Sequence, residues 1–349
     1  MTNHHKYSGI LIAALLFFAG GHSYAASWRI NNNANRKAHF SDINAAMSSS
    51  DVQSGDTLYL DPGCTLTTQQ NVTKQVTIIG TGYYLDSGTH EVGAINATLY
   101  LKAAGIKMEG VAVTTTSYKT WYVQADNITI ERCLTNYIYI QGQHATIRQC
   151  RGFHYYGKGK DSMDSAYCII ENCLLGTSSA VNIYDLCNAT ICNNYLWTRS
   201  NNTNGLLNNL KGCVIKNNII IGSQKPDVMF NAANLTECIV TNNVMSCAEG
   251  VYPAYPDNIC LGSNSSSEVF LKKLDESTYD DKEFVALMDV ELVKGVADDG
   301  GDCGPFGGTH PYVPSGYSFG MPRFVTSSSG FRATDGKVSF SNQVTIQKQ

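Results

Sequence analysis

Two carboxylates that recur at matching places in a repeat are the part of this sequence best suited to chemistry. Asp164 and Asp185 lie 21 residues apart, the length of one repeat unit, so we expect their side chains about 5 Å apart, one strand spacing. Carboxylates that close share a proton, bind a cation or turn into water. Asp164 and Asp185 are therefore candidate calcium ligands. Two other interpretations stay open: the carboxylate pair of a retaining glycosidase, and a solvated polar ladder.

The segment before Asp164 adds the kinds of side chain that a sugar site needs. It lengthens its repeat unit as an insertion, and loops that project from a rigid scaffold often carry function. Aromatic faces with a few charges suit sugar binding, although a mobile surface loop with glycine hinges is the alternative. The candidate ligand-binding residues are Tyr155, Tyr156, Lys158, Lys160, Asp161, Asp164, Tyr184, Asp185, Trp197 and Arg199.

These residues must be positioned by the repeat, which indicates a solenoid of short strands. Steps of 17 to 25 residues separate aliphatic anchors that are followed by Cys or Asn, and such a period is typical of solenoids. Leucine-rich repeats need a Leu-x-x-Leu-x-Leu pattern that is absent. We expect one buried row of anchors in about eight coils: Ile78, Met108, Ile130, Ile147, Ile170, Ile191, Ile215 and Val240.

Other aligned positions predict the remaining faces of each coil. Two residues before the anchor the chain is apolar, which gives the period-2 pattern of a strand with one buried face. Six residues before it, Gln124, Gln141, Asp164, Asp185, Asn209 and Asn234 form a polar row. Three residues after it, we expect a corner where stacked amides bond along the stack and Asn tolerates left-handed backbone: Cys133, Cys150, Cys173, Asn194, Asn218 and Asn243.

The repeated blocks resemble the right-handed parallel β-helix superfamily, the pectate-lyase-like fold, over residues 28–262. The resemblance implies an all-β protein of that architecture. Pectate lyases of this fold bind calcium through an Asp group and use Arg or Lys as the base. Asp161, Asp164 and Asp185 with Arg199 or Lys160 are similar in kind, but no local pattern matches, so no catalytic role follows. The Gly-His-Gly block of polygalacturonase-type hydrolases is absent.

The ends of the chain differ from the repeat. Residues 1–25 have the charged start, apolar run and small-x-small site of a secretory signal peptide. The β-helix is expected over 26–262, with a capping helix over Phe40–Met47 that starts at Ser41 or Asp42. Residues 263–349 are expected to be a linker and a β-strand extension that covers the last coil or lies along the solenoid. Asp298–Asp302 indicates a Gly-rich acidic turn, with calcium binding as the alternative, since the cluster lacks the Glu and the spacing of an EF-hand loop.

The 12 cysteines fall largely into the aligned rows. Stacked parallel side chains do not face each other as a disulfide requires, so we expect mostly buried thiols. One or more disulfides, usual in an exported protein, are the alternative.

Composition limits the choice of partner. Only 15% of residues are charged, the net charge is −4 and no basic run occurs, so nucleic acid is not an expected partner. No stretch after the signal peptide is apolar for the length of a membrane helix. The sequence favours a secreted or envelope β-helix protein that binds glycan or another surface component without catalysis. A polysaccharide lyase or glycoside hydrolase acting on an acidic polysaccharide, and a structural spacer or adhesin, are the alternatives.

Overall fold

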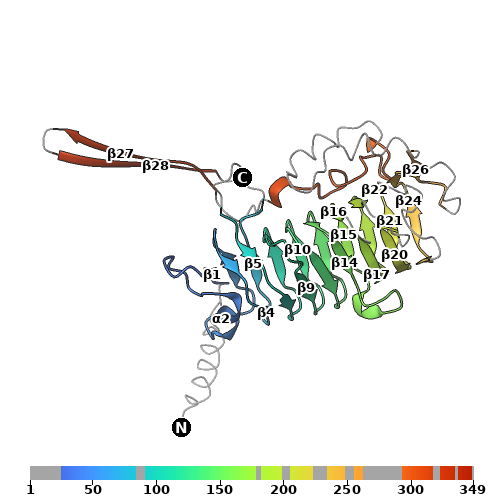
Figure 1. The fold of residues 1–349 in the computed structure, drawn as a ribbon, viewed down its shortest axis with the longest axis horizontal. Helices are drawn as coiled ribbons and strands as arrows, with labels where there is room; N and C mark the ends of the chain where they lie inside the picture. Colours follow the sequence, from blue (N-terminus) through green and yellow to red (C-terminus); the bar gives the residue numbers. More distant parts are fainter. Residues whose placement is uncertain are drawn as a thin grey trace, which may run out of the picture.

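The computed structural model describes residues 25–83, 91–177, 182–198, 205–222, 234–247, 255–261, 293–316, 323–334 and 337–347. Three parallel sheets wind around one core as a β-helix (Figure 1). The predicted signal peptide, apart from its last residue, lies outside the described residues. None of the described helices is long and apolar enough to cross a membrane.

Sheet A contributes one strand to each coil and contains the predicted anchors. Its strands, in spatial order, are β1 (Ser27–Ile30), β2 (Thr57–Leu60), β5 (Thr77–Ile79), β8 (Lys107–Glu109), β10 (Thr129–Glu131), β12 (Thr146–Arg148), β15 (Ile169–Glu171), β18 (Thr190–Cys192), β21 (Val214–Lys216) and β24 (Ile239–Thr241).

The other two sheets complete the coils. Sheet C contains β4 (Gln70–Val72), β7 (Leu99–Leu101), β9 (Thr120–Val123), β11 (Tyr137–Ile140), β14 (His154–Tyr156), β17 (Ile183–Cys187), β20 (Leu207–Lys211) and β23 (Leu235–Thr236). Sheet B contains β13 (Arg151–Gly152), β16 (Leu174–Thr177), β19 (Tyr195–Thr198), β22 (Ile219–Gly222), β25 (Val244–Met245) and β26 (Ile259–Cys260), and β3 (Thr65–Leu66) pairs with β6 (Ala94–Ile95).

The anchor row is confirmed along its whole length. Each anchor is the lateral partner of the next, from Ile78 beside Met108 to Ile215 beside Val240. Leu58 extends the row by one coil. All the anchors are buried, so the aliphatic period of the sequence specifies the register of sheet A.

Two adjacent rows form the corner between sheets A and B. Left-handed backbone was expected three residues after the anchor, but it lies two residues after it, so that expectation was wrong by one residue. Positive φ values of 51° to 57° occur two residues after six of the eight anchors, in a set that we call the corner row: Arg132, Gln149, Asn172, Asn193, Asn217 and Asn242. Four of the six are Asn, the residue that tolerates this conformation best after Gly. The predicted Asn row, one residue later, points inward instead.

That inward row is an amide ladder, as predicted. Asn218 Oδ1 accepts from the Asn194 backbone N–H at 2.9 Å, while Asn218 Nδ2 donates to the Asn243 carboxamide at 2.9 Å and to Ile191 O at 2.9 Å. Asn258 adds one more rung beyond Asn243. In the cysteine half the thiols donate to backbone carbonyls two residues earlier. The carboxamides and thiols of this row therefore have partners in their own or a neighbouring coil.

Helix α2 (Ile43–Ser48) caps the first coil, which confirms the predicted capping helix. Asp42 is the N-cap, and its Oδ1 accepts from the Ala45 N–H at 2.8 Å. Ile43, Ala46 and Met47 are buried against the core. Gln70 Oε1 also accepts from the Ile43 N–H at 3.1 Å, which fastens the helix to β4.

Residues 293–316, which we call the strap, run back along the solenoid, while the final strands do not. The strap lies over the corner row, from Asn242 near its start to Arg132 near its end (Figure 1). Strands β27 (Arg323–Thr334) and β28 (Lys337–Gln347) pair only with each other among the described strands and extend away from the coils. The expectation that these last strands cover the solenoid was therefore wrong, and an irregular segment has that role.

Candidate functional site

The predicted site residues separate onto different faces of the coil. Tyr156 on β14 and Tyr184 on β17 are lateral partners with half-buried side chains on the outer face of sheet C. Their rings stack with centroids 4.9 Å apart and planes at 2°. These two of the predicted ligand-binding residues therefore lie side by side on an outer face.

Asp164 and Asp185 are not stacked neighbours, so the premise of the carboxylate pair was wrong. The register places Tyr184 beside Tyr156, which sets Asp185 opposite Gly157 rather than Asp164. Asp164 lies in the short helix η1 (Met163–Ser165), because the insertion follows Gly157 instead of preceding the strand. Asp164 pairs with Lys158 at 2.9 Å, and Asp185 accepts from Asn209 Nδ2. Among the described residues no group of three or more His, Cys, Asp or Glu side chains gathers as a metal site.

The other predicted residues also lie apart. Tyr155 points into the core, where it is fully buried and its hydroxyl lies 3.0 Å from Thr135 Oγ1. Trp197 is buried on the outer side of sheet B, in a cluster with Val293 and Tyr312 of the strap. Asp161 pairs with Lys211 at 3.1 Å on the loop. Lys160 is part-exposed, and Arg199 lies outside the described residues.

Tyr156 and Tyr184 belong to a longer row that the sequence analysis missed. Successive coils place a tyrosine at the same outward position of sheet C, in a set that we call the tyrosine row: Tyr100, Tyr122, Tyr139, Tyr156 and Tyr184. Figure 1 shows the strands that carry the row side by side. The aromatic residues recur at steps of 22, 17, 17 and 28 residues. That recurrence is the signal that aligning on the sheet A anchors alone did not use.

The rings of the row are offset stacks that leave their outer edges accessible. Three of the four steps are near-parallel, with centroids 4.7 to 4.9 Å apart, and the step from Tyr122 to Tyr139 is edge-to-face at 68°. These separations exceed the roughly 3.5–4.0 Å of carbon contact, so parallel rings must slide past one another. Each of the five side chains therefore remains partly exposed.

The surroundings of the row are polar and weakly basic. Lys102 Nζ lies 5.2 Å from the Tyr100 ring centroid, a cation–π contact. On the same side, Gln124 Nε2 donates to Gln141 Oε1 at 3.1 Å. Burial raises the pKa of Tyr184 to about 12, with further contributions from Tyr156 and Asp185. The Tyr184 hydroxyl is therefore protonated at neutral pH and able to donate a hydrogen bond.

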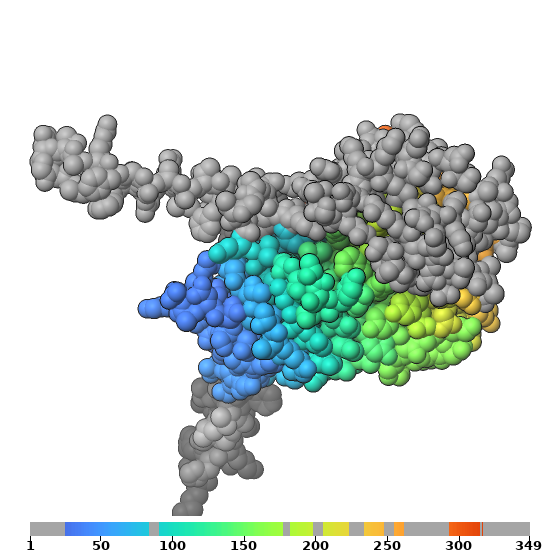
Figure 2. Space-filling model, in the orientation of Figure 1, coloured from blue at the N-terminus to red at the C-terminus, as the bar shows by residue number. Residues whose placement is uncertain are grey.

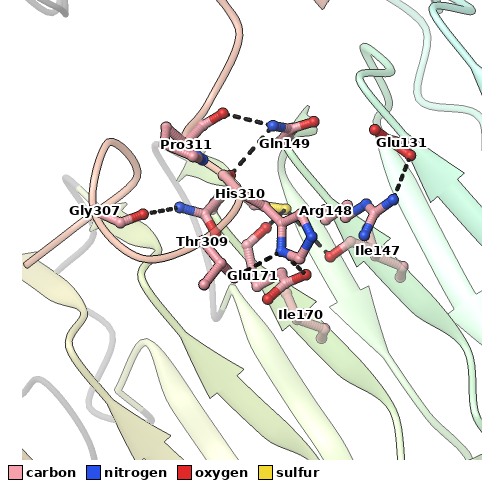
Figure 3. A network of polar contacts seen from close by, with 12 residues as sticks. Glu131, Ile147, Arg148, Gln149, Ile170, Glu171, Gly307, Thr309, His310 and Pro311 are labelled. Carbon is pink, nitrogen blue, oxygen red and sulfur yellow. Dashed lines mark hydrogen bonds and ion pairs between the residues drawn. The ribbon is translucent and has the colours of Figure 1, made fainter. Parts of the chain in front are cut away.

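A second group of charges lies on sheet A and serves cohesion. Glu131, Arg148 and Glu171 follow their anchors by one residue and are lateral neighbours. Arg148 Nη2 lies 2.9 Å from Glu131, and His310 Nδ1 of the strap lies 3.2 Å from Glu171 (Figure 3). The two glutamate side chains are each only 16% exposed. Each carboxylate has a cationic or hydrogen-bonding partner, which is how low-exposure charges are stabilised.

The corner row beside these charges binds the strap directly. Asn172 Nδ2 donates to Pro305 O at 2.9 Å and to Gly307 O at 2.7 Å. Gln149 Nε2 donates to Pro311 O at 2.5 Å (Figure 3). Asp298 Oδ1 accepts from Asn217 Nδ2 at 2.7 Å, and Lys216 pairs with its other oxygen at 2.5 Å. The acidic Gly-rich turn is thus a docking segment of the strap.

Comparison of the chain with protein-family models, with curated proteins and with solved structures found no match. Function is therefore inferred from the fold and the two outer faces.

Proposed function

We propose that the chain is an exported, non-catalytic β-helix protein that binds a polysaccharide or cell-surface glycan along the outer face of sheet C. The tyrosine row is the observation that carries this proposal. Five coils in succession present a half-buried tyrosine in the same register. A straight row of repeated contacts suits a chain-like ligand, because several sugar units can each meet an equivalent side chain.

The chemistry of the row fits a glycan better than a purely apolar ligand. Tyrosine combines an apolar ring with a polar hydroxyl, which matches the mixed apolar and hydroxylated surface of a sugar. Gln124 and Gln141 offer amides beside the rings, and Lys102 offers a cation. The face is therefore suited to a neutral or mildly acidic polysaccharide.

The same side chains support binding rather than turnover. A phenol whose pKa is raised, as burial raises those of Tyr156 and Tyr184, is a weak acid and holds its proton at neutral pH. Efficient general acid–base groups have pKa values near the working pH. A polysaccharide lyase or hydrolase, and a spacer that binds nothing, are the competing proposals.

The test is retention of the mature chain on a panel of insoluble polysaccharides, with calorimetry on soluble ones. Tyr122→Ala and Tyr139→Ala should each weaken binding by about tenfold, or roughly 1.4 kcal/mol, from the loss of one ring contact. Tyr59→Ala is the matched control, since Tyr59 is a half-buried tyrosine outside the row, on sheet A. Binding that survives both row substitutions would refute the proposal.

The same panel separates the competitors. Release of reducing ends or unsaturated products would support an enzyme acting on the polysaccharide. No retention on any polysaccharide together with no turnover would favour the spacer. Equal losses in Tyr59→Ala and Tyr139→Ala would indicate that the effect is on folding and not on the face.

A further inference from the structure

Two cysteines near the end of the solenoid face each other closely enough to be bonded. Cys247 follows β25, and Cys260 is the last residue of β26. Their Sγ atoms are 2.8 Å apart, less than 1 Å longer than a disulfide bond of about 2.05 Å. We infer that Cys247 and Cys260 form a disulfide in the exported protein, although none of the 12 cysteines is bonded in the structure.

The other cysteines show why this pair differs. In the inward row the thiols of Cys133, Cys150 and Cys173 each donate to the carbonyl two residues earlier, all at 3.2 Å. Side chains in such a row point the same way and lie side by side. Neighbouring thiols of this row lie within hydrogen-bonding reach. A disulfide needs Cβ vectors that turn toward each other, and the regular repeat does not supply that orientation.

Cys247 and Cys260 are not partners of this kind. The register of the two strands pairs Met245 with Cys260 and Val244 with Ile259. Cys247 lies two residues beyond Met245, after its strand has ended, and is buried in the same core cluster as Met245. Its Sγ approaches the next coil, where Cys260 is part-exposed and accessible to an oxidant.

The oxidation is balanced by an external disulfide. The two thiols lose two protons and two electrons as the Sγ–Sγ bond forms. A low-molecular-weight disulfide such as glutathione disulfide accepts the electrons and becomes two thiols through a mixed disulfide. Such oxidation occurs in the compartments that exported proteins reach.

The bond would fasten the end of the solenoid. It joins residues 13 positions apart, linking β26 to the coil before it. Terminal repeats have a neighbour on one side only and are the first to fray. Strand β26 contacts the previous coil through its short pairing with β25, and the rung formed by Asn258 lies directly before it.

Thiol counting on the unreduced protein tests the inference. Oxidised with a glutathione redox buffer and alkylated after unfolding, the chain should show ten reactive thiols of its 12. Peptide mapping should find one cross-linked pair that contains Cys247 and Cys260, lighter by two hydrogens. Cys260→Ser should then show 11 thiols, because Cys247 loses its partner, whereas the control Cys192→Ser should show nine.

The number of reactive thiols in the wild-type protein tests the disulfide even if a variant fails to fold. Twelve alkylated thiols after oxidation, or a cross-link that joins other cysteines, would overturn the inference. Reduction should lower the thermal midpoint of the wild-type protein and leave that of Cys260→Ser unchanged. An equal shift in both would show that the reductant acts elsewhere.

Discussion

The corner row and the tyrosine row arise from the same repeat, but the strap covers the first and leaves the second exposed. Both place one side chain per coil along the solenoid axis. The corner row is covered: Gln149, Asn172 and Asn217 are each less than 10% exposed, and the strap accepts or shares their hydrogen bonds. The tyrosine row is not covered in this way. The described residues of the strap bond to the corner, and the tyrosine rings on sheet C remain half-exposed. Any solenoid repeat therefore aligns side chains in rows. Contacts with a segment outside the repeat, here the strap, determine which rows have a structural role.

The difference lies in the chemistry of each row. The Asn and Gln residues of the corner row, whose backbone is in the left-handed conformation, direct their amide donors toward the strap. The strap is irregular, so its backbone carbonyls require donors from outside the strap. The tyrosine rings contact one another by stacking and remain half-exposed. Covered amides serve cohesion, whereas uncovered rings are available to a ligand.

The largest effect is expected in the core that supports both rows. Ile191 is fully buried between Ile170 and Ile215. Ile191→Ala should lower the free energy of unfolding by about 2–5 kcal/mol, the usual result of emptying a packed site. Ile191→Asp should prevent folding, as measured by circular dichroism and protease resistance. A soluble and protease-resistant aspartate variant would contradict this assignment.

The inward ladder should be the next most sensitive. Asn218→Ala leaves the Asn194 N–H and the Ile191 carbonyl without their side-chain partners. Each unsatisfied buried group costs about 1–3 kcal/mol, so chemical denaturation should show a loss of several kcal/mol. Asn208→Ala, on the exposed face of sheet C, should cost far less. Similar losses in the two variants would contradict a structural role specific to the inward row.

Acid should loosen the strap before it affects sheet C. The hydrogen bond from Asn217, followed by Lys216, holds the pKa of Asp298 below its ordinary value. A carboxyl with a lowered folded pKa stabilises the protein above its unfolded pKa of about 3.9, and this contribution is lost as pH falls through the lower folded value. Trp197 lies under the strap, so its fluorescence should change below about pH 4.

Two substitutions check the acid response. Asp298→Asn should flatten the change in Trp197 fluorescence, while Asp185→Asn, on sheet C, should leave it intact. Trp197→Phe identifies the signal among the three tryptophans. An unchanged acid response in Asp298→Asn would show that another group controls docking of the strap.

The smallest effect on stability is expected in the tyrosine row. Tyr139→Ala removes one parallel and one edge-to-face ring contact, each worth about 0.5–1.5 kcal/mol. The midpoint of thermal unfolding should therefore shift only modestly, while affinity for the glycan falls by about tenfold. A loss of stability as large as that of Ile191→Ala would mean that the row is structural.

Much of the solenoid was predictable because its signal is local and repeated. The anchor register, the capping helix at Asp42 and the amide ladder follow from side-chain period and residue type. The predicted site failed where the repeat is interrupted. The insertion after Gly157 moved Asp164 out of its column, because an alignment on one strand of a coil does not specify where extra residues loop out.

The sequence by itself determined which anchors stack in sheet A, since an aliphatic period specifies the buried face and one buried face specifies the register. It also determined that aromatic residues would recur on sheet C. Only the tertiary structure decided which rows remain exposed. The strap lies on the corner row from far along the chain, through contacts such as that of Asn172 with residues 133 and 135 positions away. Contacts at that separation leave no periodic trace, because they depend on where the folded surfaces meet.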